Sequence, residues 1–296
     1  MSPTDRHLAD AEQQLRAGRA PGRRYRVRRD GAALSGESGY LRETGNLVFH
    51  LALVLVIVGV AIGHVFGWKG DVIVPVGQTF TNTQTRFDTL SPGPWVDTAS
   101  DLRPFTVRVD SMDVTFEEEV TGRGQFGQPR DFTARVTVAD EPGAPTRSDV
   151  VQVNHPLEMD RATVFLLGNG YAPFVTVKDP DGTILYRGAT PFLAQDGTYR
   201  STGAIKVGAA SPEQFGFMGL FLPTSYIDPD QGPISVFPDT KSPALAMSMY
   251  TGELFPDGRP QSVFTLDTAS MTKVETADGS DQMRLWLTPG EGAKLP

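Results

Sequence analysis

The sequence predicts a membrane-anchored, mainly β protein: one transmembrane helix followed by a large antiparallel β domain of sandwich or open-barrel type. One uncharged apolar block predicts the helix, and a long series of short alternating runs predicts the strands. The 31 glycines and 23 prolines favour turns and strands over further helices. Cysteine is absent from the 296 residues, which excludes disulfides, thiolate metal sites, a catalytic cysteine and a C-x-x-C-H haem-attachment site within the chain.

The first 46 residues are predicted to form an Arg-rich segment with a short helix and a small hairpin. The helix is expected over Leu8–Ala17. Polar and apolar residues then alternate through Arg24–Arg29, and the pair Asp30-Gly31 that follows is typical of a hairpin turn.

Residues 47–68 are predicted to form the transmembrane helix. Seventeen of these 22 residues are apolar, and at about 1.5 Å per residue they reach roughly 33 Å, enough for a hydrocarbon core of about 30 Å. A cleaved signal peptide fits less well, because the run is longer than the usual signal sequence and no small-x-small cleavage site follows it.

Charge is distributed unequally on the two sides of this helix. Residues 1–46 carry a net charge of +3 and residues 69–296 a net charge of −11. The positive-inside rule therefore places residues 1–46 in the cytoplasm and residues 69–296 in an extracytoplasmic β domain. The arginines before the helix could also bind nucleic acid or anionic lipid. The orientation of the helix in the membrane already explains these arginines. We therefore expect membrane lipid as a partner and no nucleic acid.

The β domain is expected to contain many short strands joined by Gly- and Pro-rich loops at 121–130, 140–147 and 188–233. The last loop carries the apolar stretch Phe215–Leu222, for which a binding surface, a membrane-touching lid and a loop packed on the core are all open; packing on the core is preferred. The expected strands are Asp71–Val76, Pro104–Phe116, Asp131–Val138, Val150–Val153, Thr163–Leu167, Phe174–Lys178, Thr183–Arg187, Ile234–Phe237, Ala244–Tyr250, Ser262–Leu266 and Arg284–Leu287.

Motifs for catalysis are absent from the expected β domain, and no catalytic residue is assigned. Only one histidine, His155, lies in it, which excludes a multi-histidine zinc site. The acidic run Glu117–Glu119 and the stretch Asp179–Gly182 are both interpreted as turns. An extracytoplasmic hydrolase is therefore a weak hypothesis.

Polar residues inside a transmembrane helix are costly and usually functional, and this helix contains His50 and His64. They are separated by about 21 Å along the axis, so they cannot bind one iron together. Gly59, Gly63 and Gly67 form a stripe on a different face, expected to pack closely against other helices. For His50, a proton relay, an interhelical hydrogen bond and a haem ligand are all open, with the hydrogen bond commonest in general. His64 lies near enough to the interface to be hydrated.

Several segments resemble the ResB-like cytochrome c biogenesis family (System II, or Ccs system), especially its actinobacterial members. The similarity runs from about Tyr25 onward, with the motifs in the family's order. The matching segments are Gly39–Leu53, Asn154–Leu157, Gly168–Pro173, Ser235–Asp239 and Pro260–Thr268.

The resemblance implies a subunit of a complex that moves haem b across the bacterial plasma membrane and helps attach it to apocytochrome c. It implies a ResC-type (CcsA-type) membrane partner with a tryptophan-rich haem-handling motif, and a non-catalytic or scaffold role for this chain in the haem lyase. His50 matches the family histidine regarded as a transient axial haem ligand, with the second ligand from the partner. Neither His64 nor His155 matches a family ligand.

ResB-like proteins usually have two further transmembrane helices upstream and one downstream, so the resemblance also implies that this chain is a fragment or a truncated gene product. The alternative function is a single-pass anchored extracytoplasmic β domain that binds a partner or ligand without haem.

Overall fold

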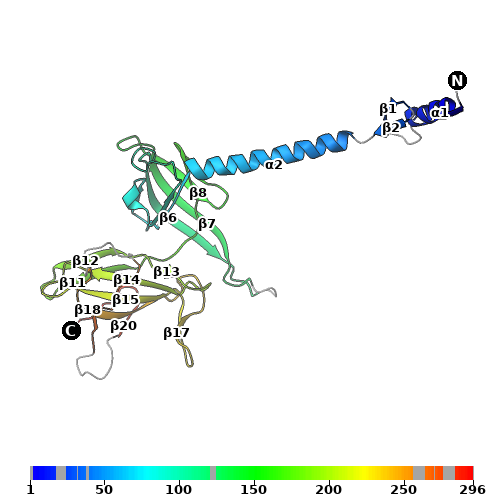
Figure 1. The fold of residues 1–296 in the computed structure, drawn as a ribbon. Helices are drawn as coiled ribbons and strands as arrows, with labels where there is room; N and C mark the ends of the chain where they lie inside the picture. Colours follow the sequence, from blue (N-terminus) through cyan, green and yellow to red (C-terminus); the bar gives the residue numbers. More distant parts are fainter. Residues whose placement is uncertain are drawn as a thin grey trace. The chain divides into compact units, whose positions relative to one another are not determined.

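The computed structural model describes residues 3–17, 25–31, 33–37, 40–120, 125–255, 264–269, 271–275 and 284–295 (Figure 1). The chain divides into two compact units. The first comprises Met1–Lys69 and Ser91–Val96, and the second comprises Gly70–Leu90 and Asp97–Pro296. The division of the chain at residues 46 and 68 stays a prediction.

The first unit begins with a helix and a hairpin. Helix α1 (Pro3–Ala17) contains the predicted helix, and strands β1 (Arg26–Asp30) and β2 (Ala33–Glu37) pair antiparallel. Gly31 has a φ of +57°, the left-handed conformation that a tight hairpin turn requires. Helix α1 packs against both strands, so these elements form one small folded segment.

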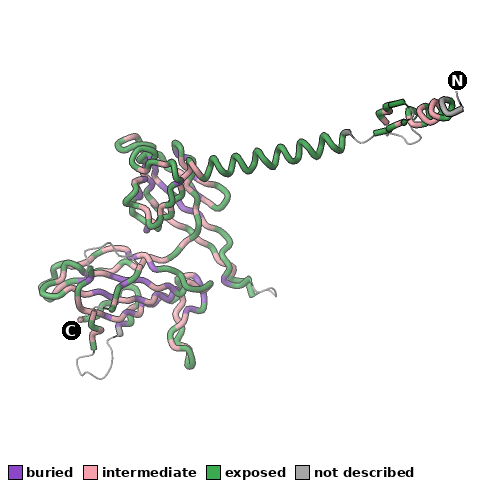
Figure 2. Tube along the Cα trace, viewed as in Figure 1, coloured by how far each residue is buried: buried purple, intermediate pink, exposed green. Residues whose placement is uncertain are grey.

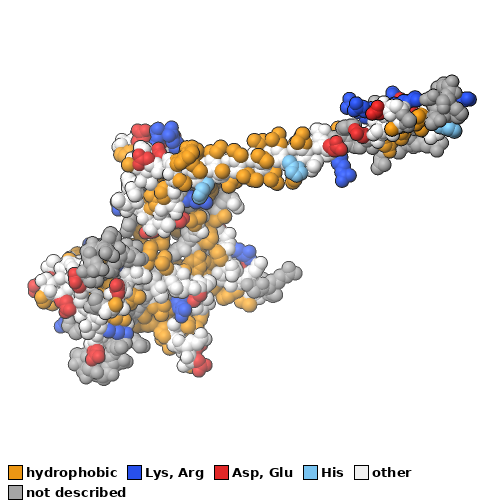
Figure 3. Space-filling view, in the orientation of Figure 1, with side chains coloured by type: hydrophobic (Ala, Val, Ile, Leu, Met, Phe, Trp, Pro, Cys, Tyr) orange, Lys and Arg blue, Asp and Glu red, His pale blue; other side chains and the backbone are white. Residues whose placement is uncertain are grey.

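Helix α2 (Tyr40–Phe66) contains most of the predicted transmembrane segment, and its part from Leu41 is long and apolar enough to cross a membrane. Figure 2 shows the helix exposed along its length, and Figure 3 shows hydrophobic side chains covering it. An exposed apolar surface of this kind is unfavourable in water and suits lipid. Together with the β-sheets described below, α2 confirms the predicted fold class of one transmembrane helix followed by mainly antiparallel β structure.

The second unit contains a four-stranded antiparallel sheet, here called the first sheet. Its spatial order is β4 (Thr79–Thr81), β6 (Thr106–Phe116), β7 (Pro129–Ala139) and β8 (Arg147–Gln152). Alternate residues of β6 and β7 face its core, as the sequence pattern predicts. The buried core comprises Phe80, Phe105, Val107, Ala134, Val136, Val138, Val151, Leu157 and Met159.

A larger sheet, here called the second sheet, has the order β13 (Leu193–Ala194), β14 (Ser201–Val207), β15 (Phe215–Leu222), β18 (Ala244–Thr251) and β19 (Thr272–Lys273), with β20 (Arg284–Leu287) also paired to β18. Its main core comprises Val177, Phe192, Ile205, Val207, Phe217, Phe221, Leu245, Met247, Met249 and Leu285. Among the described strands the sheets are open.

The remaining strands form two-stranded ladders, and one short 3₁₀ helix, η1 (Gln84–Arg86), lies before β5. The pairs are β3 (Trp68–Asp71) with β5 (Thr89–Pro92), β9 (Leu157–Met159) with β10 (Ala162–Val164), β11 (Phe174–Lys178) with β12 (Ile184–Ala189), and β16 (Ser225–Asp228) with β17 (Gly232–Ser235).

The expectation of a long loop over 188–233 is wrong. This stretch contains β14 and β15, and β15 is an interior strand of the second sheet. Its apolar run follows from burial on both faces: Phe217 packs in the main core, while Met218 contacts a separate cluster containing Leu254. The sequence FGFMGLFL is therefore a core strand rather than a binding surface or a lid.

Other strand boundaries also differ from the sequence expectation, most by one to three residues. Residues 72–76 are not strand, because the ladder uses Trp68–Asp71 instead. Strand β10 ends at Val164, and β17 ends at Ser235. The predicted strand Ser262–Leu266 falls partly outside the described residues, and its described part, 264–266, is not strand.

Candidate functional site

His50 lies in the first half of α2, with its ring directed along the helix. Its Nδ1 lies 2.7 Å from the carbonyl oxygen of Asn46, four residues earlier. A carbonyl oxygen can only accept a hydrogen bond, so Nδ1 carries the proton. When the ring is neutral, its lone pair then lies at Nε2, the arrangement by which histidines ligate metals.

The surroundings of His50 are apolar and open. Phe49 contacts the imidazole edge-to-face, with ring centroids 5.5 Å apart. His50 is exposed in the first unit, so its Nε2 atom is accessible to a group that approaches the helix. Chemically, the residue offers one nitrogen ligand on an exposed apolar helix.

His64 occupies the last turn of the same helix and is exposed. Its backbone carbonyl lies beneath Gly93, where an added Cβ would come within 2.4 Å of that oxygen. The described part of the chain contains no cluster of three or more histidine, aspartate or glutamate residues that could hold a metal ion.

The three glycines of the predicted stripe have different surroundings. An added Cβ at Gly59 or Gly63 would meet nothing within 4 Å, so both present open backbone on which another helix could pack. At Gly67 a Cβ would lie 2.3 Å from the carbonyl oxygen of Gly63. The Gly67 N–H donates a 2.9 Å hydrogen bond to the Gly63 carbonyl at the end of the helix. A glycine at position 67 is therefore explained by the local geometry of the helix end.

In the second unit, two of the sequence motifs converge although they are far apart in the chain. The Tyr171 hydroxyl, from the motif Gly168–Pro173, donates a 2.6 Å hydrogen bond to the carbonyl oxygen of Pro238, from Ser235–Asp239. The Tyr199 hydroxyl donates to Asn169 Oδ1 at 2.7 Å. We call this meeting point the motif junction.

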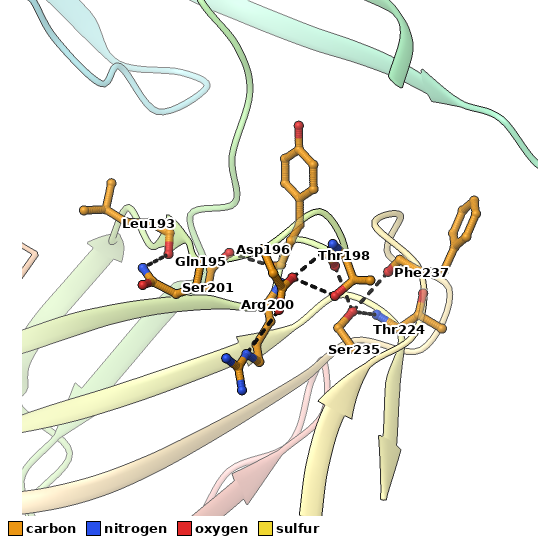
Figure 4. A network of polar contacts seen from close by, with 10 residues as sticks. Leu193, Gln195, Asp196, Thr198, Arg200, Ser201, Thr224, Ser235 and Phe237 are labelled. Atoms are coloured by element: carbon orange, nitrogen blue, oxygen red, sulfur yellow. Dashed lines mark hydrogen bonds and ion pairs between the residues drawn. The ribbon is translucent and has the colours of Figure 1, made fainter. Parts of the chain in front are cut away.

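Figure 4 shows the polar contacts beside the motif junction. The Ser235 hydroxyl lies 2.9 Å from the carbonyl oxygen of Thr198 and accepts the Thr224 N–H at 3.4 Å. Asp196 accepts the N–H and the hydroxyl of Thr198 at 3.0 and 2.7 Å, and it also pairs with Arg200. These contacts fix the loop between β13 and β14, which carries Tyr199.

Aromatic rings join the end of the β6–β7 hairpin to this junction. Phe116 contacts Tyr199 and Phe237 edge-to-face, with centroids 5.7 and 6.2 Å apart. Lys241 adds an ion pair with Glu118 at 2.9 Å and lies 4.3 Å from the centroid of the Phe237 ring. Ring contacts and an ion pair thus connect the first sheet to the second sheet at the motif junction.

Burial raises the pKa of Tyr171, and the nearby Asp239 carboxylate raises it further. Burial likewise raises the pKa of Tyr199. Both phenols therefore keep their protons at neutral pH and remain hydrogen-bond donors.

The motif Asn154–Leu157 forms a tight turn on the first sheet. Asn154 has a φ of +63°, a conformation that asparagine tolerates, and His155 bonds back to Gln152 through its backbone. Leu157 is 2% exposed in the core. The exposed His155 side chain stays without an assigned role. The motif Pro260–Thr268 lies partly outside the described residues.

Sequence reasoning missed Thr198, Tyr199 and Phe116 as members of the junction. Their contacts come from three segments widely separated in sequence, and local patterns do not report such contacts. One available signal in the sequence was Tyr199 itself, an aromatic residue among turn-forming residues. In the structure this residue has a φ of +56°.

A family model described as the ResB-like family matches residues 1–289 of this chain. A curated relative, the cytochrome c biogenesis protein CcsB of Synechococcus sp. (strain RCC307), is 26% identical over 148 residues. That match covers 50% of this chain but only 29% of the relative's length. No solved structure matches the chain.

Proposed function

Because this chain belongs to the ResB-like family, we propose that it is a membrane subunit of a cytochrome c biogenesis complex. The name of the curated relative supports the same process. Within that process the subunit helps move haem b across the membrane and assists its attachment to apocytochrome c. Its partner is a ResC-type membrane protein, and its own part in the haem lyase is that of a scaffold.

His50 carries this proposal. The hydrogen bond from Nδ1–H to the Asn46 carbonyl fixes the tautomer and leaves Nε2 free to bind iron. A neutral imidazole is a common axial ligand of haem, and ligation gives an otherwise costly polar group a reason to lie in hydrocarbon. The second axial ligand comes from the partner.

Orientation follows from charge in this proposal. The arginines precede α2, so residues 1–46 are cytoplasmic and residues 69–296 extracytoplasmic. His50 then lies about 4.5 Å inside the cytoplasmic edge of the apolar block, on the side where haem is made. Protease added to intact spheroplasts should digest the second unit, and protection of that unit would contradict the orientation.

The scaffold role draws on the motif junction. Tyr171, Tyr199 and Phe116 link the two sheets through hydrogen bonds and ring contacts, and the two tyrosine pKa values are raised. These contacts hold the segments of the junction in a fixed shape. We propose that this shape positions the partner and apocytochrome c outside the membrane.

The deciding experiment compares two histidine variants. The chain is co-expressed with a ResC-type partner, purified in detergent, and examined for the Soret band of bound haem. His50→Ala should remove or strongly shift the band and stop cytochrome c maturation, whereas His64→Ala is the matched control on the same helix and should do neither. Damage by His64→Ala with a silent His50→Ala would overturn the ligand assignment.

A rescue experiment separates ligation from a structural effect. In a His50→Gly variant, added imidazole should restore the Soret band, because the free base can supply the missing nitrogen. A band that imidazole leaves unchanged, in a variant that still co-purifies with the partner, would show that His50 does not bind the iron.

A second candidate function, ligand or partner binding without haem, is favoured by a cavity of about 900 Å³ in the second unit. Its lining is mainly apolar and includes the partly buried residues Val175 from β11, Leu185 from β12 and Leu287 from β20. A volume of this size suits a small apolar ligand. A colourless complex with the partner, in the first experiment, would favour this second function.

A further inference from the structure

The end of α2 is covered by a short segment that comes from about 25 residues further along the chain. Ser91–Val96 belongs to the same compact unit as the helix, although residues 70–90 between them belong to the other unit. The Gly93 N–H donates to the Gly67 carbonyl at 2.8 Å, and the Trp95 N–H donates to the Val65 carbonyl at 3.2 Å. We call Ser91–Val96 the return segment.

The return segment supplies partners for carbonyl groups that a helix end otherwise leaves unsatisfied. Gly93 makes this approach possible, since a Cβ there would lie 2.4 and 2.5 Å from the carbonyl oxygens of His64 and Val65. Those atoms are backbone and cannot move aside as a flexible side chain could. The contact therefore depends on a residue without a side chain at position 93.

Trp95 is placed by this contact beside the last apolar turn of the helix. Its ring meets Phe66 edge-to-face, with centroids 5.2 Å apart and planes at 73°. The residue is nevertheless 71% exposed, and Phe66 is 57% exposed. Two large aromatic side chains thus form an exposed pair where the transmembrane segment ends, and Trp68 follows Phe66 two residues later in the chain.

We propose that the return segment is a second membrane contact, with the Trp95 indole lying at the boundary between phospholipid headgroups and acyl chains. Tryptophan prefers this boundary because its ring is apolar while its N–H needs a polar partner. The occupant is phospholipid of the membrane that α2 spans. The proposal requires only that α2 crosses the membrane, in either orientation, and is independent of haem binding.

The experiment uses tryptophan fluorescence, because the chain has three tryptophans. The full chain with Trp68→Phe and Trp286→Phe, which leaves only Trp95, is placed in phosphatidylcholine vesicles whose acyl chains are brominated close to the headgroup. Bromine quenches only nearby indoles, so Trp95 emission should fall relative to unbrominated vesicles, as expected for a ring at the interface. Emission equal to that in unbrominated vesicles would overturn the proposal.

The matched control retains Trp286 alone, through Trp68→Phe and Trp95→Phe. Trp286 lies in β20 of the second sheet and is 40% exposed. It should show no quenching by the same lipid. Equal quenching of Trp286 and Trp95 would mean non-specific contact with the vesicle and would also overturn the proposal.

A Gly93→Ala variant tests whether the contact at the helix end places Trp95. In the background with Trp95 alone, Gly93→Ala should displace the return segment and reduce quenching, while a variant with Trp68 alone keeps its quenching. Unchanged Trp95 quenching in Gly93→Ala would show that the contact at the helix end does not position the indole. The emission of Trp286 in its own background reports whether the second unit remains folded.

Discussion

The hydroxyl of Tyr171 donates a 2.6 Å hydrogen bond to the carbonyl oxygen of Pro238, across 67 residues of sequence. Pro238 is one of the fully buried residues of the second unit. Its carbonyl therefore depends on the tyrosine for a partner, since buried acceptors without one are costly. The bond joins two segments of the motif junction at a point where water has little access.

Tyr171→Phe should destabilise the second unit by about 1–3 kcal/mol, because it leaves the Pro238 carbonyl buried without its donor. Urea unfolding followed by fluorescence measures this change. Tyr226→Phe is the matched control. Because Tyr226 is 51% exposed, removing its hydroxyl should leave the free energy of unfolding nearly unchanged. Equal effects of the two substitutions would contradict the role given to the Tyr171 hydroxyl.

Gly219→Ala should destabilise the second sheet by about 1–3 kcal/mol through overpacking. The added Cβ would lie 2.6 Å from the Phe192 ring, which is 3% exposed and has little space to move. Gly197→Ala, with nothing within 4 Å of its Cβ, is the control and should be nearly neutral. Thermal unfolding compares the variants, and adding Phe192→Leu to Gly219→Ala should recover part of the loss.

The Glu117 carboxylate should make stability depend on pH in the acidic range. The backbone N–H of Glu119 and then the Arg130 side chain hold the pKa of this carboxyl below its usual value of 4.5. A lowered pKa in the folded state stabilises the fold above the unfolded value, and that stabilisation is lost as pH falls through the folded pKa.

Glu117→Gln should therefore be less stable than the original chain at neutral pH, with the difference disappearing as the pH falls below 4.5. Because the ion pair with Arg130 is partly exposed, the effect should be small and weakened by salt. Unfolding at several pH values measures the difference. A gap that stays constant down to strongly acidic pH would contradict the assignment.

Gly63→Leu should weaken association of α2 with other transmembrane helices while leaving membrane insertion intact. The backbone at Gly63 is open, so a leucine side chain would block close approach there. Ala61→Leu is the control, because two residues turn the helix by about 200° and place that position on the opposite side. Co-purification with a full-length partner distinguishes the two, and unchanged recovery with Gly63→Leu would mean that the stripe faces lipid.

Local patterns predicted the elements whose causes are local. The apolar block gave α2 to within two residues at its carboxyl end, and β11 and β20 have the predicted boundaries. Strand β15 was missed because Gly216 and Gly219 resemble loop residues in sequence. Their reason is tertiary: a side chain at Gly219 would collide with a ring from another segment.

In the candidate site, too, some features could be predicted from local sequence and others depend on tertiary contacts. His50 could be identified from the sequence because an imidazole in an apolar helix is conspicuous, whereas its hydrogen bond to Asn46 required coordinates. The motifs containing Tyr171 and Pro238 were both recognised, but their meeting was not foreseen. Strand order decides which distant segments become neighbours, and alternation within a strand carries no information about that order.

The packing of Phe192 over paired glycines has a consequence for how related sequences can diverge. Gly203 and Gly219 lie opposite each other on β14 and β15, and a Cβ on either would collide with the same ring. Side chains at positions 192, 203 and 219 would thus compete for the same space. Homologues with a side chain at position 203 or 219 should carry a smaller residue at 192, so the three positions should change together during evolution.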